Sequence, residues 1–391
     1  MSKVEPFTLG IDATNLRSGG GLTHLVELLN MVKPELHGFK RVVVWGGKST
    51  LNSLKEKPWL RKFNPLALNK NLFKRAYWQR YCLSKEARDE GCDLLFIPGG
   101  SYAGNFYPVV VMSQNLLPFE TKELRRYGWT FFTLKLLFLR LTQSHSFRKS
   151  NGVIFLTKYA QDIVLRVTGN LSGQISIVPH GLNSRFYKLP KLQKNIIEYN
   201  KFIPYRVLYV SIIDQYKHQW NVVEAIAILR KKGFPISLDL VGPAYPPALM
   251  RLNAIIDKLD PRRYWVRYHG NIPYDELHNQ YMQADLGLFA SSCENMPNIL
   301  LETMASGLPI ACSNKGPMPE VLTNTGIYFD PEQPDDIARA LFELIESSSL
   351  RTKLAKSSYS LAQKYSWQCC ANETFIFLNA VLQRYKGANN V

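Results

Sequence analysis

Short apolar runs alternate with helical patterns along the whole chain, and this alternation constrains the fold more than any other feature of the sequence. Apolar runs bounded by polar turns predict buried strands, and the longer amphipathic stretches between them predict helices. The expected strands are 7–12, 41–45, 94–97, 109–112, 152–156 and 175–178 in the first half, and 206–211, 236–241, 265–269, 286–290, 310–313 and 327–329 in the second. Two such series predict two doubly wound, Rossmann-like α/β domains.

The segment from Ser291 to Ile310 joins two of the expected strands and carries the strongest functional pattern. Pro297 fits the entry to a helix, and Asn298 is a plausible N-cap. Gly307 and Pro309 fit the exit from that helix. A helix that starts directly after a strand has free backbone N–H groups at its positive end, so a phosphate site is expected there. An ordinary capped helix beside surface glutamates is the alternative.

Two carboxylates flank this expected helix start. Glu294 lies in the loop and Glu302 about one turn into the helix, so both are expected to reach hydroxyl groups of a ligand whose phosphates lie at the helix end. Sugars and ribose are rich in such hydroxyl groups. The further residues expected to border the ligand are Asn295, Met296, Asn298, Ile299 and Leu300.

This segment resembles the donor-site signature of the retaining glycosyltransferases of family 4, which have the GT-B fold. The signature is a glutamate, seven residues, a second glutamate and a helix that ends at Gly-x-Pro, and Glu294, Glu302 and Gly307 match it. The resemblance covers nearly the whole chain and implies two domains that face a central cleft. It also implies that Glu302 binds the ribose of a nucleotide diphosphate sugar and that Glu294 contacts the donor sugar.

Other positions match or depart from the family pattern. Lys217 matches the family's phosphate-binding lysine, but Ile212 stands where many members carry an arginine. His218 is a candidate for the donor that Ile212 leaves missing. Gln114 and Asn115 replace a His-Asp pair, and a neutral amide can position a sugar hydroxyl but cannot act as a general base. The changes mark either a subfamily or weakened catalysis.

Two further elements are candidates for the donor site. The stretch from Ser18 to Gly21 follows the first expected strand and opens a helix, so Gly20 and Gly21 are expected to approach the ligand closely. A flexible turn is the alternative, because the stretch is neither a dinucleotide fingerprint nor a P-loop. Glu320 resembles the family's Pro-Glu element below the donor site, and an ordinary helix-start glutamate is its alternative.

The two domains are expected at 1–186 and 187–370. The linker is expected at 183–204, where prolines, lysines and asparagines interrupt the regular pattern. A last helix, from about 367 to 385, is placed by the resemblance, which implies that the end of the chain (about 371–391) packs back on the first domain.

Positive charge is concentrated in the first half of the chain. Residues 1–190 hold 27 Lys and Arg against 12 Asp and Glu, a net charge of +15, whereas residues 191–391 hold 21 against 19, a net charge of +2. Such a one-sided field attracts an anionic surface or ligand. Anionic lipid is the expected partner, because no nucleic-acid recognition motif accompanies the charge.

The stretch 122–150 is basic, aromatic and very apolar, with Arg125, Arg126, Trp129 and Phe131 near its start. A helix of this composition can lie in a bilayer interface with its cations on anionic head groups. A core helix flanked by charges is the alternative. We therefore expect a cytoplasmic protein that is peripheral on the inner face of the cytoplasmic membrane.

The remaining composition excludes several classes of protein. The six cysteines lack metal-ligand spacing and are expected to be reduced thiols in a cytosol. The sequence has no Asp-x-Asp motif, so no metal is expected, and no cofactor beyond the nucleotide diphosphate sugar as co-substrate. The sequence shows neither a signal-peptide pattern at its start nor an uncharged apolar stretch long enough to span a bilayer. A signal peptide and a membrane-spanning helix are therefore not expected.

The sequence is best explained by a hexosyltransferase with a lipid-linked or anionic glycan acceptor, of the kind used to build bacterial surface polysaccharide. Lys217 and the helix start would stabilise the leaving diphosphate. Two alternatives stay open at this point. One is a non-catalytic protein of the same fold that binds a nucleotide sugar or a lipid, and the other is a different GT-B enzyme, such as an epimerase or a glycogen-type synthase.

Overall fold

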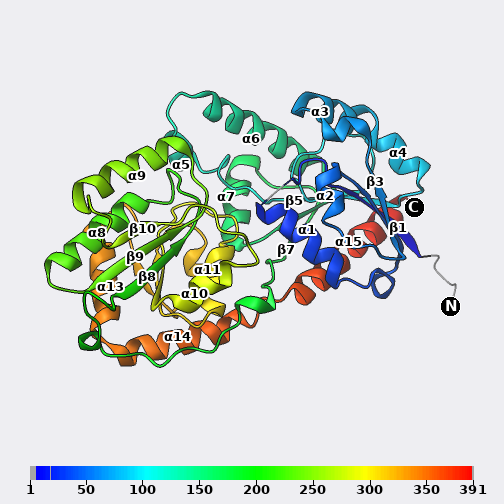
Figure 1. Ribbon diagram of the computed structural model, residues 1–391. Helices are drawn as coiled ribbons and strands as arrows, with labels where there is room; N and C mark the ends of the chain where they lie inside the picture. The colour runs from blue at the N-terminus through cyan, green and yellow to red at the C-terminus, as the bar shows by residue number, and fades with distance from the viewer. Residues whose placement is uncertain (1–5, 18, 390–391) are drawn as a thin grey trace. The chain divides into compact units, whose positions relative to one another are not determined.

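The computed structural model describes residues 6–17 and 19–389, with the side chain at 389 excepted, and these form two compact units (Figure 1). Unit 1 comprises the described residues of 1–121, 129–181 and 366–391, and unit 2 comprises 122–128 and 182–365. The division falls at Gly181/Leu182 and at Tyr365/Ser366, whereas the sequence placed it at 186/187 and near 370. Ser18 of the expected glycine-rich element lies outside the described residues.

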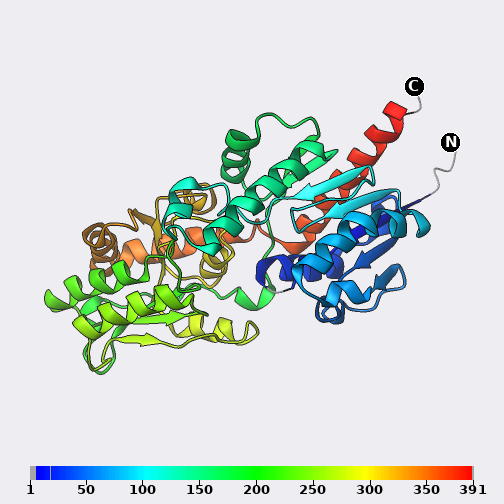
Figure 2. The same ribbon diagram turned by 90° about the horizontal axis from the view of Figure 1, so that it is seen from above.

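Unit 1 is built on a seven-stranded parallel sheet with the order β3-β2-β1-β4-β5-β6-β7. Its strands are β1 (Phe7–Asp12), β2 (Phe39–Trp45), β3 (Leu60–Phe63), β4 (Leu94–Ile97), β5 (Val109–Met112), β6 (Gly152–Phe155) and β7 (Gln174–Ile177). Its helices are α1 (Gly19–Met31), α2 (Lys48–Asn52), α3 (Leu72–Tyr81), α4 (Leu83–Asp89), α6 (Phe131–Lys149), α7 (Lys158–Thr168) and α15 (Trp367–Asn389), with the short 3-10 helices Pro34–His37 and Leu66–Asn69. The buried side chains of α3, α4, α6 and α7 form one apolar core with the strands, and α15 packs against α1 (Figure 2).

Unit 2 is built on a six-stranded parallel sheet with the order β10-β9-β8-β11-β12-β13. Its strands are β8 (Tyr205–Val210), β9 (Ile236–Val241), β10 (Val266–Tyr268), β11 (Leu286–Phe289), β12 (Ile310–Ser313) and β13 (Ile327–Phe329). Its helices are α5 (Thr121–Arg125), α8 (Gln219–Lys231), α9 (Pro246–Leu259), α10 (Leu277–Gln283), α11 (Asn298–Ala305), α12 (Met318–Leu322), α13 (Pro334–Glu346) and α14 (Ser348–Ala362), with the 3-10 helices Ser184–Phe186 and Ile196–Glu198. The predicted pair of doubly wound α/β domains is confirmed.

Every strand expected from the sequence is present within a residue or two of its predicted bounds, but β3 was missed. This strand lies at the edge of its sheet, and Arg61 and Lys62 interrupt its apolar pattern. Charged side chains are common on edge strands because they discourage pairing with another chain. A short edge strand therefore lacks the apolar run by which buried strands are recognised.

The sequence suggested that the stretch 122–150 forms one helix, but the structure divides it into two elements. Residues 122–128 belong to unit 2, and the chain turns at Gly128, whose φ is 62°. The long helix α6 then begins after Thr130, whose side chain accepts a hydrogen bond from the Thr133 amide as an N-cap. A glycine in the left-handed region followed by a capping threonine ends one element and starts another.

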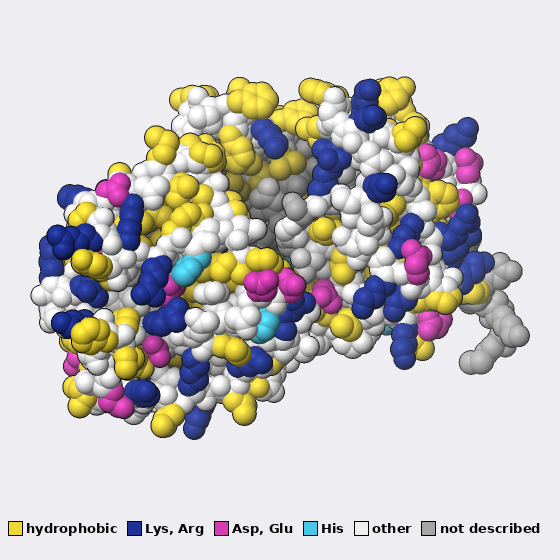
Figure 3. Space-filling model, viewed as in Figure 1, with side chains coloured by type: hydrophobic (Ala, Val, Ile, Leu, Met, Phe, Trp, Pro, Cys, Tyr) yellow, Lys and Arg dark blue, Asp and Glu magenta, His cyan; other side chains and the backbone are white. Residues whose placement is uncertain are grey.

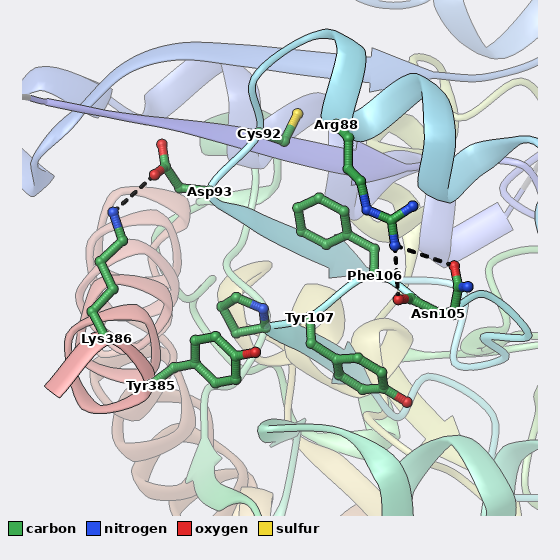
Figure 4. Close-up of a pocket in the computed structure, with 9 residues that line it drawn as sticks. Arg88, Cys92, Asp93, Asn105, Phe106, Tyr107, Tyr385 and Lys386 are labelled. Carbon is green, nitrogen blue, oxygen red and sulfur yellow. Dashed lines mark hydrogen bonds and ion pairs between the residues drawn. The ribbon is translucent and has the colours of Figure 1, made fainter. Parts of the chain in front are cut away.

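The last helix, α15, is fastened to the sheet of unit 1 near its end. Lys386 Nζ lies 2.9 Å from Asp93 Oδ1, next to the start of β4. Figure 4 shows this ion pair at one side of a shallow pocket, with the Arg88 guanidinium directed at Asn105 on the other side. Across the described ranges, no helix is both long enough and apolar enough to cross a bilayer.

Arg351 of α14 fixes the segment that leads from unit 1 into β8. Its guanidinium is fully buried and donates to the Leu344 and Ile345 carbonyls, at 2.7 and 2.6 Å, and to the Lys194 carbonyl. It also lies over the Tyr205 ring, 5.4 Å from the ring centroid. The Arg351 side chain therefore provides hydrogen-bond donors both to carbonyl groups at the end of α13 and to a carbonyl group of the incoming segment.

We expect Arg351→Met to destabilise the protein by about 3 kcal/mol, because three carbonyl groups lose a buried charged donor. Arg339→Met removes a more exposed arginine of unit 2 and should cost less than about 1 kcal/mol. Urea unfolding of both variants measures the difference. Equal free energies of unfolding for the two variants would contradict the anchoring role of Arg351.

Candidate functional site

The sequence-predicted residues of unit 2 gather where the strand order of its sheet reverses. β8 and β11 are neighbours, although β9 and β10 separate them along the chain. Lys217 lies in the segment after β8, and Glu294 lies in the segment after β11. In doubly wound sheets, ligands bind outside the carboxyl ends of the strands at this point of reversal. The fold itself therefore brings Lys217 and Glu294 together.

Lys217 and Glu294 form an ion pair between Nζ and Oε1. Both side chains are largely buried, with 7% and 16% of their surface exposed. The ammonium group also lies 4.8 Å from the ring centroid of Tyr216 and 5.5 Å from that of Phe289. Two charges that are held in a nearly dry environment are costly unless they compensate each other. The pair therefore fixes a cation and a carboxylate at the mouth of the β8–β11 crevice.

Helix α11 begins beside this pair, one residue away from the predicted cap. Pro297 is the N-cap residue and Asn298 is the first helical residue, so the predicted capping role of Asn298 is wrong. The backbone N–H of Asn298 donates to the backbone carbonyl oxygen of Met296, 2.9 Å away, in a tight turn. This turn brings Asn298 into the helix.

The amides of Ile299 and Leu300 make no backbone–backbone hydrogen bond within the described chain, as expected for N2 and N3 of a helix. The side chains of Met296 and Leu300 are buried in the core. These residues can therefore contribute to an anion site only through their backbone.

Glu302 lies in the interior of unit 2, with 3% of its surface exposed. The Tyr274 hydroxyl donates to its Oε1 at 3.1 Å, and the Tyr281 hydroxyl to its Oε2 at 3.2 Å. Burial raises the pKa of Glu302 to about 8, although these hydrogen bonds lower it in part. Tyr274 and Tyr281 were not predicted from the sequence, because nothing in the spacing of 274, 281 and 302 indicates that they meet.

His218 caps α8 with a left-handed backbone (φ 53°) and is 1% exposed. Its Nε2 lies 2.9 Å from Ser292 Oγ, and that hydroxyl donates to Glu123 Oε2 at 2.7 Å. Burial, with a contribution from Arg126, lowers the pKa of His218 to about 3, so the ring is neutral near pH 7. His218 therefore adds no positive charge near pH 7, and its role as the donor that Ile212 leaves missing stays a prediction.

The segment 122–128 is a second feature that the sequence did not reveal. Besides the Glu123 contact, the Tyr127 hydroxyl donates to Asp214 Oδ1 at 2.8 Å. Arg126 bridges Glu123 and Glu332, with N–O distances of 2.7 and 2.8 Å. A lone acidic residue, Glu123, in a basic stretch was the one available signal in the sequence. The segment packs on the loops that carry Lys217 and Ser292, so it belongs to the surroundings of the site.

The predicted residues of unit 1 form their own cluster. Gly21 lies so close to Gln114 that a Cβ at Gly21 would be 2.6 Å from Gln114 Oε1. Gln114 Nε2 lies 3.3 Å from Nδ1 of the buried His24. A side chain at position 21 would therefore displace the Gln114 amide. Gly20 is exposed at the start of α1.

Glu320, the last residue predicted for the donor site, lies on the short helix α12. Glu320 is exposed on the first turn of α12 and lies near Tyr365, whose pKa is raised mainly by burial and also by this carboxylate. Among the described residues, no group of three or more His, Cys, Asp or Glu side chains is placed to hold a metal ion.

Comparison with known proteins identifies unit 2. Residues 193–361 match the family model described as glycosyl transferases group 1. These residues belong to that family. The family domain covers the whole reversal point, including Lys217, Glu294 and the start of α11.

Two named proteins are similar to longer parts of the chain. The chain is 25% identical to the O-antigen chain mannosyltransferase B of Escherichia coli over 225 residues, which are 57% of this chain and 56% of that protein. The chain thus spans little more than half of this relative's length. Sucrose-phosphate synthase of Thermosynechococcus elongatus has the same fold, with a TM-score of 0.75 and 17% identity over 98% of this chain and 100% of that chain.

A structure of Anabaena HepE in complex with UDP and glucose also has this fold, with a TM-score of 0.65 and 15% identity over 98% of this chain and all of that chain. The likeness to these solved structures extends over both units. The predicted fold, a pair of Rossmann-like domains of the GT-B type, is therefore confirmed.

Glu302→Gln should change the pH dependence of stability. The pKa of Glu302 rises from 4.5 to about 8 on folding, so the folded state binds the proton more tightly. The stability that this group contributes is complete below about pH 4.5 and is lost as the pH rises through about 8. We expect the melting temperature of the wild type to fall relative to that of Glu302→Gln between about pH 5 and about pH 9.

Glu320→Gln, which removes an exposed carboxylate of the same unit, supplies the control. A constant difference between the wild type and Glu302→Gln over the same pH range would show that Glu302 does not titrate as proposed.

Proposed function

We propose that this protein is a retaining hexosyltransferase that uses a nucleotide diphosphate sugar, without a metal ion, as a family 4 enzyme. The observation that carries the proposal is the placement of Lys217, Glu294 and the start of α11 at the β8–β11 reversal. A cation beside free helix amides favours the diphosphate that leaves when the sugar–oxygen bond breaks. The group 1 family match and the UDP complex of HepE support this assignment.

In this proposal the diphosphate binds the amides of Ile299 and Leu300 and the ammonium group of Lys217. Because Lys217 is paired with Glu294, the incoming phosphate competes with that carboxylate for the cation. Glu294 is then released toward the hydroxyl groups of the donor sugar. Charge that develops on the leaving group in the transition state strengthens the Lys217 contact, which is the requirement for catalysis.

Glu302 is proposed to bind the ribose by exchanging one of its two tyrosine partners for the ligand. Tyr274 is the more exposed of its two hydroxyl partners, whereas Tyr281 is buried. Ribose hydroxyl groups would replace the Tyr274 hydroxyl on Oε1, while Tyr281 keeps Oε2 in place. A buried carboxyl group that is already directed by one tyrosine loses little freedom when a ligand binds.

The proposed acceptor is a lipid-linked or anionic glycan at the inner face of the cytoplasmic membrane. Helix α6 and the residue pair before it expose Trp129 (96%) and Phe131 (85%), and α3 exposes Phe73. Figure 3 shows hydrophobic side chains over α6 and α3, with Lys and Arg among them. Exposed aromatic groups beside cations suit an anionic bilayer surface. The likeness to an O-antigen mannosyltransferase supports a role in surface polysaccharide synthesis.

A non-catalytic binding protein is the second candidate. Ile212 stands in place of the usual arginine, and the Gln114 amide, held by His24, is no general base. Such a protein would bind the nucleotide without transferring the sugar, so binding and turnover must be measured separately.

Nucleotide binding is tested by the melting temperature in the presence of UDP, GDP, ADP and dTDP. A ligand that binds only the folded protein raises the melting temperature, by an amount that grows with its concentration above Kd. We expect a shift with one of the four nucleotides and a much smaller one in Glu302→Ala. The absence of a shift with all four would contradict the proposed donor site.

Turnover is tested with Lys217→Met and a matched control, Lys315→Met, which removes a more exposed lysine of the same unit that pairs with Asp330. We expect the rate of sugar release from the nucleotide to fall by about 100-fold or more in Lys217→Met and by less than about twofold in Lys315→Met. Nucleotide binding without turnover in the wild type would favour the non-catalytic candidate.

Membrane contact is tested by sedimentation with vesicles. We expect binding to phosphatidylglycerol vesicles to weaken with salt and to be lost in the double variant Trp129→Ser/Phe131→Ser, because both the charge and the aromatic groups are required. Vesicles of phosphatidylcholine alone should bind little. Equal binding to the two kinds of vesicle would contradict an anionic membrane partner.

A further inference from the structure

A cavity of about 910 Å³ lies in unit 1, at the carboxyl ends of its parallel strands. Its floor comes from the loops after β1 and β4, including Thr14 and Ser101, and its walls come from α3 and α6. β1 and β4 are the neighbours at which this sheet reverses its strand order, which is the position where doubly wound sheets bind ligands. The cavity therefore has both the place and the size of a ligand site.

The lining of the cavity combines an apolar wall with positive charge. The apolar side chains from the two helices include Leu72, Ala76, Phe138, Leu139 and Leu141. The cations are Arg17, Arg75, Arg80, Lys135 and Lys149. No aspartate or glutamate stands among the described residues that line it. This composition fits a ligand with one apolar part and one anionic part.

Three polar atoms on the lining have no hydrogen-bond partner among the described residues. They are Gln143 Oε1, Ser101 Oγ and Arg75 Nε, and Gln143 is 3% exposed. Buried polar groups are rarely left unpaired unless a ligand or water completes them. Three such atoms in one cavity indicate a polar end to the ligand, next to the guanidinium group of Arg75.

Arg75 and Arg17 are held in place by hydrogen bonds to backbone carbonyl groups. Arg75 Nη1 donates to the Thr14 carbonyl at 3.1 Å, and Arg17 Nη2 donates to the Leu68 carbonyl at 2.9 Å. Burial, together with the charge of Arg17, lowers the pKa of Arg75, and no carboxylate of the described residues forms an ion pair with it. The nearby Asp12 is occupied by Thr14, and burial raises its pKa. An anionic group would therefore gain a favourable place here.

We propose that this cavity binds the lipid end of the acceptor, as a single apolar chain between α3 and α6 that ends in a phosphate or diphosphate at Arg75. The inference deepens the proposed function and rests on it, because it gives the acceptor a chemical class. Phe138 lines the cavity, whereas Phe131 is exposed on the same helix outside it.

Farnesyl phosphate is a suitable probe, because it is a short, water-soluble form of such a chain. Calorimetric titration of the purified full-length protein should show binding, and farnesol or inorganic phosphate alone should bind at least about tenfold more weakly. Phe138→Ser should weaken the binding of farnesyl phosphate about tenfold, and the matched Phe131→Ser should leave it unchanged. Both phenylalanines are exposed, so neither change threatens the fold.

The charge requirement is tested with Arg75→Gln, which should weaken binding about tenfold, against the exposed Arg166→Gln on α7, which should not. Melting temperatures verify that both variants fold. Equal binding of inorganic phosphate would reduce the cavity to an anion site and overturn the proposal. Equal binding of farnesol, or equal losses in Phe138→Ser and Phe131→Ser, would overturn it as well.

The nucleotide measurement on unit 2 separates this inference from the proposed function. Binding of farnesyl phosphate without a shift by any nucleotide would support the cavity and contradict the glycosyltransferase. A nucleotide shift without binding of farnesyl phosphate would overturn the cavity site and leave the donor site standing.

Discussion

The functional features of this protein depend on one constraint, which is that parallel strands place all their carboxyl ends at one edge of a sheet. Both sheets reverse their strand order once, between β1 and β4 in unit 1 and between β8 and β11 in unit 2. At a reversal the crossover helices leave in opposite directions, and a crevice remains that no helix fills. The Lys217–Glu294 pair lies at one reversal and the apolar, basic cavity at the other.

The electrostatics of the unit 2 site follow from burial. Lys217 and Glu294 compensate each other, so the site holds both charges with little access to water. Among the described residues no cation forms an ion pair with Glu302, and burial raises its pKa although Tyr274 and Tyr281 donate hydrogen bonds to it. Two glutamates of one signature thus lie in different environments, one in an ion pair and the other between two tyrosine hydroxyl groups. Their environments, rather than their residue type, assign them different roles.

The segment 122–128 joins the two units in a way that simple domain boundaries do not capture. It leaves the sheet of unit 1 after β5, contributes Glu123, Arg126 and Tyr127 to unit 2, and returns at Trp129 to begin the approach to α6. Glu123 and Tyr127 are buried there, and each makes a hydrogen bond to the loops around Lys217. The same short segment therefore links the loops of the proposed donor site to the helix that carries the exposed aromatic groups.

The sequence by itself determined the strands, the fold class and the neighbourhood of Lys217 and Glu294. Apolar periodicity is local, and the point where a strand gives way to a Pro297-led helix is written in consecutive residues. The sequence could not show β3, an edge strand with charged residues, or the cap at Pro297 in place of Asn298.

Only the tertiary structure decided which distant side chains meet. It placed Tyr274 and Tyr281 on Glu302, made His218 a neutral capping residue, and gathered Arg75 and Gln143 around one cavity. These contacts join residues from separate strands, loops and helices, and no spacing along the chain encodes them. Burial then set the charges of the groups it enclosed, because desolvation depends on the whole of the surrounding packing.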